Sequence, residues 1–183
     1  MKKIVKYFFI IISAIFLIYL SLPSPDFPEN SSKSIQSKEL ADMEDANRKG
    51  YYSDEDREDV INYYKNSFDT LAVFNIQRIS YRLNYPPENA QTIIRDQTRS
   101  TFLEEIVHPF RESLFINGFE PKYDQDVIID NGKRWKQKII VKYVESSLVA
   151  RFVFGVSTLA LLTLIYKESI NFLKDIGFRS RPI

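Results

Sequence analysis

Residues 126–143, DVIIDNGKRWKQKIIVKY, contain the clearest β-strand pattern in the chain. Asn131 and Gly132 separate two apolar runs, and both residue types tolerate the positive φ angles that a two-residue hairpin turn requires. The sequence therefore predicts a β-hairpin. In its second strand, alternate side chains share one face of the strand: Trp135, Gln137, Ile139, Val141 and Tyr143.

Upstream of the hairpin, residues Pro87–Gly118 are predicted to form one long helix, with the proline in its first turn and the glycine at its end. The apolar residues of its first half point to a different side from those of its second half. This helix either breaks near Gln97 or contacts different neighbours with its two halves. The second half has an apolar stripe at helical spacing: Leu103, Ile106, Val107, Phe110 and Leu114.

We expect the long helix to carry the interaction surface of the domain. Asp96 and Arg99 are three residues apart and would form either a partly buried pair that fixes geometry or a solvated salt bridge of little energy. The predicted interaction residues are Ile93, Ile94, Asp96, Arg99, Leu103 and Phe110.

Two further elements complete the predicted domain. A helix begins near Ser53, and its apolar stripe contains Val60, Tyr64, Phe68 and Leu71. Ile79–Tyr85 alternates apolar and polar residues, which is typical of a half-buried strand. The order of helix, strand, long helix and hairpin predicts an α+β domain with the long helix over one face of a small sheet.

A hydrophobic segment lies near each end of the chain. Ile4–Leu22 is predicted to be a retained transmembrane helix, and the alternative is a cleaved signal peptide. Leu148–Tyr166 is predicted to be a second transmembrane helix, and the alternative is a buried core helix. The residues predicted to lie at the membrane interface are basic or aromatic: Lys6, Arg151, Tyr166 and Lys167.

Charge is distributed unevenly along the chain. Between Pro23 and Ser147 the sequence has 17 Lys and Arg against 22 Asp and Glu, whereas the ends carry a net positive charge. Basic residues flank both hydrophobic segments on their outer sides, so we expect an integral membrane protein with both termini cytoplasmic and the central domain extracytoplasmic.

This topology gives five predicted regions. Residues 1–22 and 148–167 are transmembrane helices, and residues 23–51 form a flexible polar spacer. The extracytoplasmic α+β domain spans residues 52–147. Residues 168–183 are a basic, amphipathic cytoplasmic tail.

Three residues on one predicted polar helix face, Glu104, His108 and Arg111, are the candidates for acid–base or metal chemistry. Two potential ligands are too few for a zinc site, and the sequence contains no cysteine. A surface network next to a kink at Pro109 explains the same residues more simply. We therefore expect no metal and no cofactor.

The sequence favours a membrane-anchored interaction module that serves as an accessory or assembly subunit of a membrane or envelope complex. Its expected partners are the lipid bilayer and another membrane or envelope protein. Nucleic acid is not expected, because the central region is acidic. The alternatives are a membrane-bound hydrolase or metalloenzyme that uses the Glu104, His108 and Arg111 face, and a ligand or lipid sensor.

Overall fold

The computed structural model describes residues 2–43, 45–71, 76–86, 89 and 99–179. The chain forms two compact units. One unit contains both ends of the chain, residues 1–22 and 146–183, and the other contains residues 23–145. Each unit is described by itself below.

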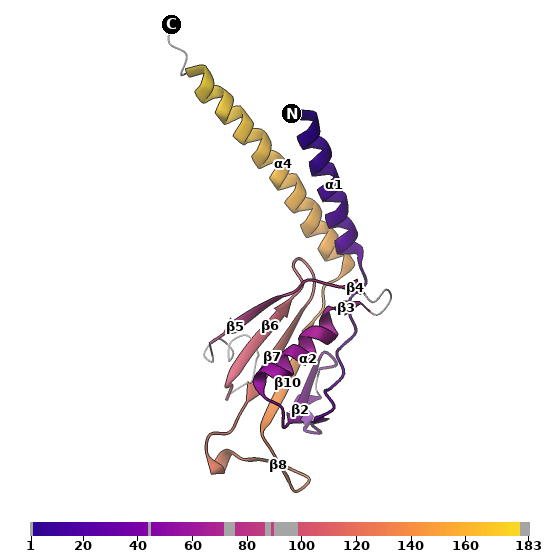
Figure 1. Ribbon diagram of the computed structural model, residues 1–183, viewed down its shortest axis with the longest axis vertical. Coiled ribbons are helices and arrows are strands. Elements are labelled where there is room, and N and C mark those ends of the chain that lie inside the picture. The colour runs from indigo at the N-terminus through magenta and orange to yellow at the C-terminus, as the bar shows by residue number, and fades with distance from the viewer. Residues whose placement is uncertain (1, 44, 72–75, 87–88, 90–98, 180–183) are drawn as a thin grey trace. The chain divides into compact units, whose positions relative to one another are not determined.

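Unit 23–145 is built on an antiparallel sheet (Figure 1). In the described part of the chain it has six strands in the order β1-β2-β10-β7-β6-β5. Because β10 lies between β2 and β7, the last strand of the unit pairs with an early strand on one side and a middle strand on the other. The bounds are β1 Ser34–Gln36, β2 Arg48–Ser53, β5 Tyr81–Tyr85, β6 Phe102–Val107, β7 Ser113–Phe119 and β10 Gln137–Val144.

Shorter elements connect these strands. Two small antiparallel pairs, β3 with β4 and β8 with β9, lie outside the main sheet. The remaining bounds of this unit are η1 Leu40–Asp42, α2 Arg57–Asp69, β3 Thr70–Leu71, β4 Ile76–Gln77, η2 Asp124–Asp126, β8 Ile128–Asp130 and β9 Lys133–Trp135.

Helix α2 covers one face of the sheet and supplies a third of the buried core cluster. Its residues Val60, Tyr64 and Phe68 are buried, as their helical spacing predicts. They pack on the inward side chains of four strands. This buried cluster consists of Tyr51, Val60, Ile61, Tyr64, Phe68, Phe102, Ile106, Leu114, Ile116, Ile139, Val141 and Tyr143.

The predicted hairpin is confirmed. Asn131 and Gly132 have φ angles of 50° and 76°, and β8 pairs with β9 across them. The predicted shared face of the second strand is also confirmed, and the structure shows that it is buried at every second residue from Trp135 to Tyr143. Lys136 interrupts the strand, so β9 and β10 are separate elements.

The predicted long helix is wrong. Residues 102–107 and 113–119 are antiparallel strands β6 and β7, paired over six positions. Their apolar residues fit a helical spacing, but the pairing of β7 with β10 is a non-local interaction that overrides it. Pro109 and Phe110, whose φ is 61°, form the turn between the strands instead of a helix kink. The first half of that predicted helix lies mostly outside the described residues.

The prediction of a flexible spacer at 23–51 also fails. This region contributes β1 and β2 to the main sheet, and β2 pairs with β10 over six positions. The side chain of Lys138 on β10 forms ion pairs with Glu39 and Asp42, which hold η1 beside β2. The polar composition of this region gave no indication of strands β1 and β2.

Two predicted boundaries also shift. The predicted strand at 79–85 is present as β5, but it is an end strand and its first four residues are exposed, not half-buried. Ser53 ends β2 and does not start a helix, because α2 begins at Arg57 after the N-cap Asp56.

The second unit consists of helices α1, Lys2–Ser21, and α4, Leu148–Arg179. Stretches of 18 residues in α1 and 27 residues in α4 are long and apolar enough to cross a membrane. α4 continues without a break into the region predicted as a tail. The helices pack closely where Gly155 faces Leu20, because a Cβ atom at Gly155 would lie 2.3 Å from the Leu20 side chain.

Gly118 on β7 provides a test of the sheet packing. A Cβ atom there would lie 2.0 Å from the buried ring of Phe102, so we expect Gly118→Ala to destabilise the protein by about 1–3 kcal/mol through overpacking. Thermal unfolding of the full chain in detergent would show a lower midpoint. Shortening the opposing ring in Gly118→Ala/Phe102→Leu should recover part of the loss. Equal midpoints for wild type and Gly118→Ala would contradict this packing.

Candidate functional site

The three residues considered as candidates for acid–base or metal chemistry lie in two separate clusters in unit 23–145. Glu104 is in the middle of β6, and its side chain points to the face of the sheet covered by α2. His108 and Arg111 belong to the turn between β6 and β7. The polar face expected to unite all three is absent, because the helix that would have formed it is not there.

The first cluster surrounds Glu104, which has no exposed surface. Arg57 at the start of α2 and Arg82 on β5 both bind its carboxylate, with 2.9 Å from Arg82 Nε to Glu104 Oε2. Arg82 also donates two hydrogen bonds of 2.9 Å to the exposed Glu58. These bonds lower the pKa of Glu58 and raise that of Arg82. The cluster therefore links α2 to strands β5 and β6.

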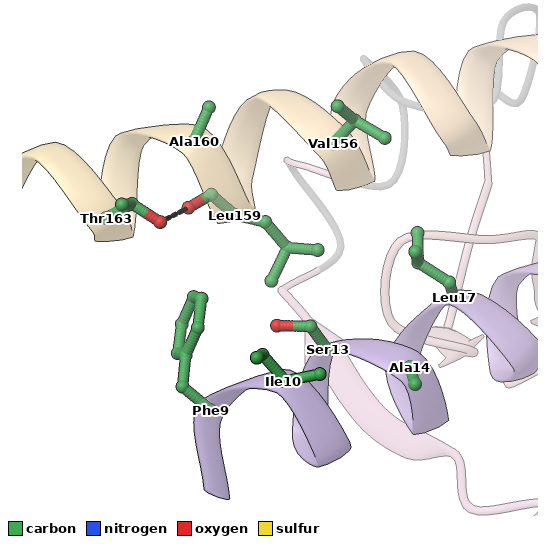
Figure 2. Close-up of a pocket in the computed structure, with 9 residues that line it drawn as sticks. All are labelled: Phe9, Ile10, Ser13, Ala14, Leu17, Val156, Leu159, Ala160 and Thr163. Carbon is green, nitrogen blue, oxygen red and sulfur yellow. Dashed lines mark hydrogen bonds between the residues drawn. The ribbon is translucent and has the colours of Figure 1, made fainter. Parts of the chain in front are cut away.

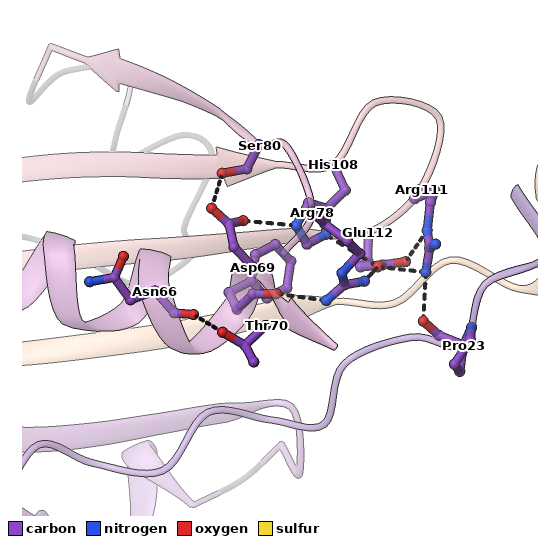
Figure 3. A network of polar contacts seen from close by, with 10 residues as sticks. Pro23, Asn66, Asp69, Thr70, Arg78, Ser80, His108, Arg111 and Glu112 are labelled. Carbon is purple, nitrogen blue, oxygen red and sulfur yellow. Dashed lines mark hydrogen bonds and ion pairs between the residues drawn. The ribbon is translucent and has the colours of Figure 1, made fainter. Parts of the chain in front are cut away.

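The second cluster, the His108 cluster, is defined as Asp69, Arg78, His108, Arg111 and Glu112 (Figure 3). The turn that supplies three of its members is closed by backbone hydrogen bonds. His108 N donates to Glu112 O at 3.0 Å, and Arg111 N donates to His108 O at 2.9 Å. Asp69 is the last residue of α2, and Arg78 follows β4.

The imidazole of His108 is enclosed on several sides. Its Nε2 lies 3.0 Å from Asp69 Oδ1, and its Nδ1 lies 3.3 Å from Glu112 Oε1. One ring face stacks on Phe68, with ring centres 4.2 Å apart. Ser80 donates a hydrogen bond of 2.9 Å to the other oxygen of Asp69. His108 has no exposed surface, so the ring is held in place by the protein and is closed to a substrate from solvent.

Two arginines bind the carboxylate of Glu112. Arg78 donates to Glu112 Oε1 at 2.9 Å and to the Phe68 carbonyl at 2.6 Å. Arg111 donates to the same carboxylate at 3.0 Å and to the Pro23 carbonyl at 2.8 Å. Burial lowers the pKa of Arg78, and the neighbouring Glu112 opposes that effect. Two carboxylates and two guanidinium groups compensate one another, which buried charges require.

Sequence reasoning missed Asp69, Arg78 and Glu112. Asp69 and Arg78 lie 39 and 30 residues before His108, and no local spacing links them to it. Glu112 lies four residues after His108, a spacing that would bring the two side chains together even on a helix, so the sequence did contain a signal for this pair. In the part of the chain that the structure describes, no three His, Asp or Glu side chains are grouped to hold a metal ion.

The predicted interaction residues have different positions. Ile93, Ile94 and Asp96 lie outside the described residues. Arg99 is exposed and pairs with Asp126, and Phe110 is half-exposed in the turn. Leu103, by contrast, is fully buried on the sheet face opposite α2. Partly buried hydrophobic side chains that pack around it are Tyr85 and Phe115.

The face opposite α2, here called the second sheet face, carries exposed apolar side chains. Tyr81 and Leu83 on β5 are 60% and 44% exposed, and Val144 on β10 is 40% exposed. Strand register places these residues on the same face, in rows completed by Val107 and Phe115. These five residues form the candidate interaction surface.

A polar contact borders this surface. The Tyr85 hydroxyl donates a hydrogen bond of 2.6 Å to Glu105 Oε2, on the neighbouring strand β6. That bond raises the pKa of Tyr85 to about 12. The phenol therefore keeps its proton at neutral pH and holds the Glu105 carboxylate beside the apolar residues.

In the helical unit, the predicted interface residues differ in environment. Lys6, Tyr166 and Lys167 are exposed. Arg151 is only 3% exposed and donates a hydrogen bond of 3.1 Å to the Leu22 carbonyl, just past the end of α1. Its guanidinium therefore joins the end of α1 to the start of α4.

The buried charges of the His108 cluster provide a test of its structural role. Glu112→Gln removes the carboxylate that both arginines bind, and breaking a buried pair costs about 3–5 kcal/mol. The matched control is Glu58→Gln, which removes an exposed carboxylate and should cost about 0.2–1 kcal/mol. Unfolding midpoints of the two variants measure the difference. Equal losses would contradict a structural role for the cluster.

Comparisons with models of protein families, with curated proteins and with solved structures find no match to this chain.

Proposed function

We propose that this chain is a membrane-anchored interaction module, an accessory or assembly subunit of a membrane or envelope complex. The observation that carries the proposal is the second sheet face, where Tyr81, Leu83 and Val144 expose apolar surface on one side of the sheet. Clustered exposed apolar side chains mark interaction sites, and tyrosine is enriched among residues that dominate binding energy.

The partner that fits this surface is a protein. The row through Leu83 continues over Glu105, Phe115 and Lys142, so opposite charges are interspersed with apolar side chains. Protein interfaces combine apolar and polar side chains in this way, and about half of their area is apolar. The surface replaces the long helix as the part of the domain that meets a partner.

The alternative, a hydrolase or metalloenzyme, has less support. It requires Glu104, His108 and Arg111 to act together, but arginines bind Glu104 in one cluster while His108 is enclosed in another. Both clusters connect elements of the fold. Their contacts are explained by packing and charge compensation alone.

In the proposed topology α1 and α4 cross the membrane, both termini are cytoplasmic and unit 23–145 is extracytoplasmic. The two helices run antiparallel, since Lys6 of α1 lines the same groove as Tyr166 and Ile170 of α4. The basic residues at the start of α1 and those near the end of α4 therefore share one end of the helical unit. Basic residues favour the cytoplasmic side, which supports this orientation.

Cysteine labelling tests the topology directly, because the natural sequence has no cysteine. Ser32→Cys lies on the exposed surface of unit 23–145, and Asn171→Cys is exposed on α4. A membrane-impermeant maleimide applied to intact cells should label Ser32→Cys, and should label Asn171→Cys only after permeabilisation. The reverse pattern would show the opposite orientation, and equal labelling of both before permeabilisation would argue against two spans.

Co-purification tests the interaction surface. Leu83→Glu places a charge on the second sheet face and should weaken partner binding by at least about tenfold, corresponding to about 1.4 kcal/mol. The matched control is Ile129→Glu, which changes an exposed isoleucine of β8, outside the main sheet. Partners would be quantified by mass spectrometry after gentle extraction and sizing. A wild-type monomer without a co-purifying protein would count against the proposal.

A further inference from the structure

A groove separates α1 and α4 on one side of their crossing point (Figure 2). At the crossing itself, Gly155 allows Leu20 to approach α4 closely. From there the two helices diverge toward the end where the chain starts (Figure 1). A hollow of about 470 Å³ begins next to Leu17 and Val156.

A second hollow continues the groove toward the start of α1. Its volume is about 680 Å³, and it shares Phe9, Ile10 and Thr163 with the first. Each volume lies in the range of about 300–1,000 Å³ that is usual for ligand sites. Because they share lining residues, the two hollows adjoin each other along the groove between the helices.

The lining of the groove is apolar except at a few positions. The Thr163 hydroxyl donates a hydrogen bond of 2.8 Å to the Leu159 carbonyl of its own helix, so the helix already satisfies it. Lys6 and Tyr166 line the second hollow at its outer end. Among the described residues that line either hollow, none is acidic. An apolar groove lined at its outer end by a lysine and a tyrosine matches an amphiphile with an anionic head.

We propose that this groove binds an anionic phospholipid, with one acyl chain between α1 and α4 and the phosphate at Lys6 and the Tyr166 hydroxyl. The inference rests on the proposed membrane insertion of both helices. Charge complementarity favours a lipid over a third helix. An apolar helix would bury the Lys6 ammonium without a counter-charge, whereas a phosphate pairs with it. A long lysine side chain also reaches the headgroup region readily.

Native mass spectrometry of the full chain in detergent, with equal amounts of phosphatidylglycerol and phosphatidylcholine, tests this site. We expect about a fivefold preference for phosphatidylglycerol, which corresponds to the roughly 1 kcal/mol that one lysine contributes at an anionic lipid surface. Lys6→Gln should remove the preference. The matched control is Lys167→Gln, which removes the same charge at the same end of the unit from a residue that does not line the groove.

A second pair of variants tests the acyl chain. Thr163→Phe adds bulk where the two hollows meet and should reduce binding of both lipids at least fivefold. Leu164→Phe adds an aromatic ring at an exposed position that does not line the groove and should leave lipid binding unchanged.

Several outcomes would overturn the lipid site. These are equal binding of the two lipids by wild type, equal effects of Lys6→Gln and Lys167→Gln, and unchanged binding in Thr163→Phe. A disulfide between two copies of Thr163→Cys would instead assign the groove to a second copy of the chain. Alkaline extraction of wild-type membranes distinguishes a failure of the lipid-site proposal from a failure of the proposed membrane insertion. A protein that resists extraction but shows no lipid preference disproves the lipid site alone, and an extracted protein disproves membrane insertion.

Discussion

The two-sided pairing of β10 is the interaction on which the rest of the domain depends. One edge of β10 pairs with β2 from Gln137 to Lys142, and the other pairs with β7 from Lys138 to Val144. Every second side chain points into the core beneath α2. This strand forms backbone hydrogen bonds on both edges and is buried on one face. Its register is therefore fixed, because a slip of one residue would expose that face. The positions of β7 and β6 follow from it.

The buried charges depend on that sheet. The β6–β7 turn can bring His108 and Glu112 to the end of α2 only because both strands are held in register. In return, the His108 cluster connects the turn to Asp69, and the Glu104 cluster connects α2 to the end strand β5. Each cluster contains arginine and carboxylate groups in similar number, so the buried charges are compensated. Their specific geometry favours one packing of helix on sheet.

The sequence predicted those elements whose signals are local. The Asn131-Gly132 turn requires two residues of a particular type, and the α2 stripe requires only its own spacing. Leu103 and Ile106 were wrongly assigned to a helix because their spacing fits one. They are in a strand because β6 pairs with β7, and that pairing leaves no signal in the local spacing. The strand β2 was not predicted because its sequence is mostly polar and its pairing partner is distant in the sequence. Its hydrogen bonds go to β10, which lies about 90 residues later in the chain.

The candidate site in the structure differs from the site predicted from the sequence. Sequence spacing placed Glu104 and His108 on one helix face. In the structure Glu104 lies on strand β6 and His108 in the turn after it, so the two residues belong to different clusters. The apolar surface on β5 followed from the strand register, because residues that face each other across strands share one side of the sheet. Both terminal helices contain the predicted apolar stretches, whereas α4 continues past its predicted end at residue 167 to Arg179.

The most direct test of an interaction role is photocrosslinking in native membranes, with a photoreactive amino acid in place of Tyr81 on the second sheet face. We expect a crosslink to a discrete membrane or envelope protein. The same photoreactive residue at Ile129, outside the main sheet, should not form this crosslink. Equal crosslinking from both positions, or crosslinking from Tyr81 to lipid alone, would rule out an interaction role for the second sheet face.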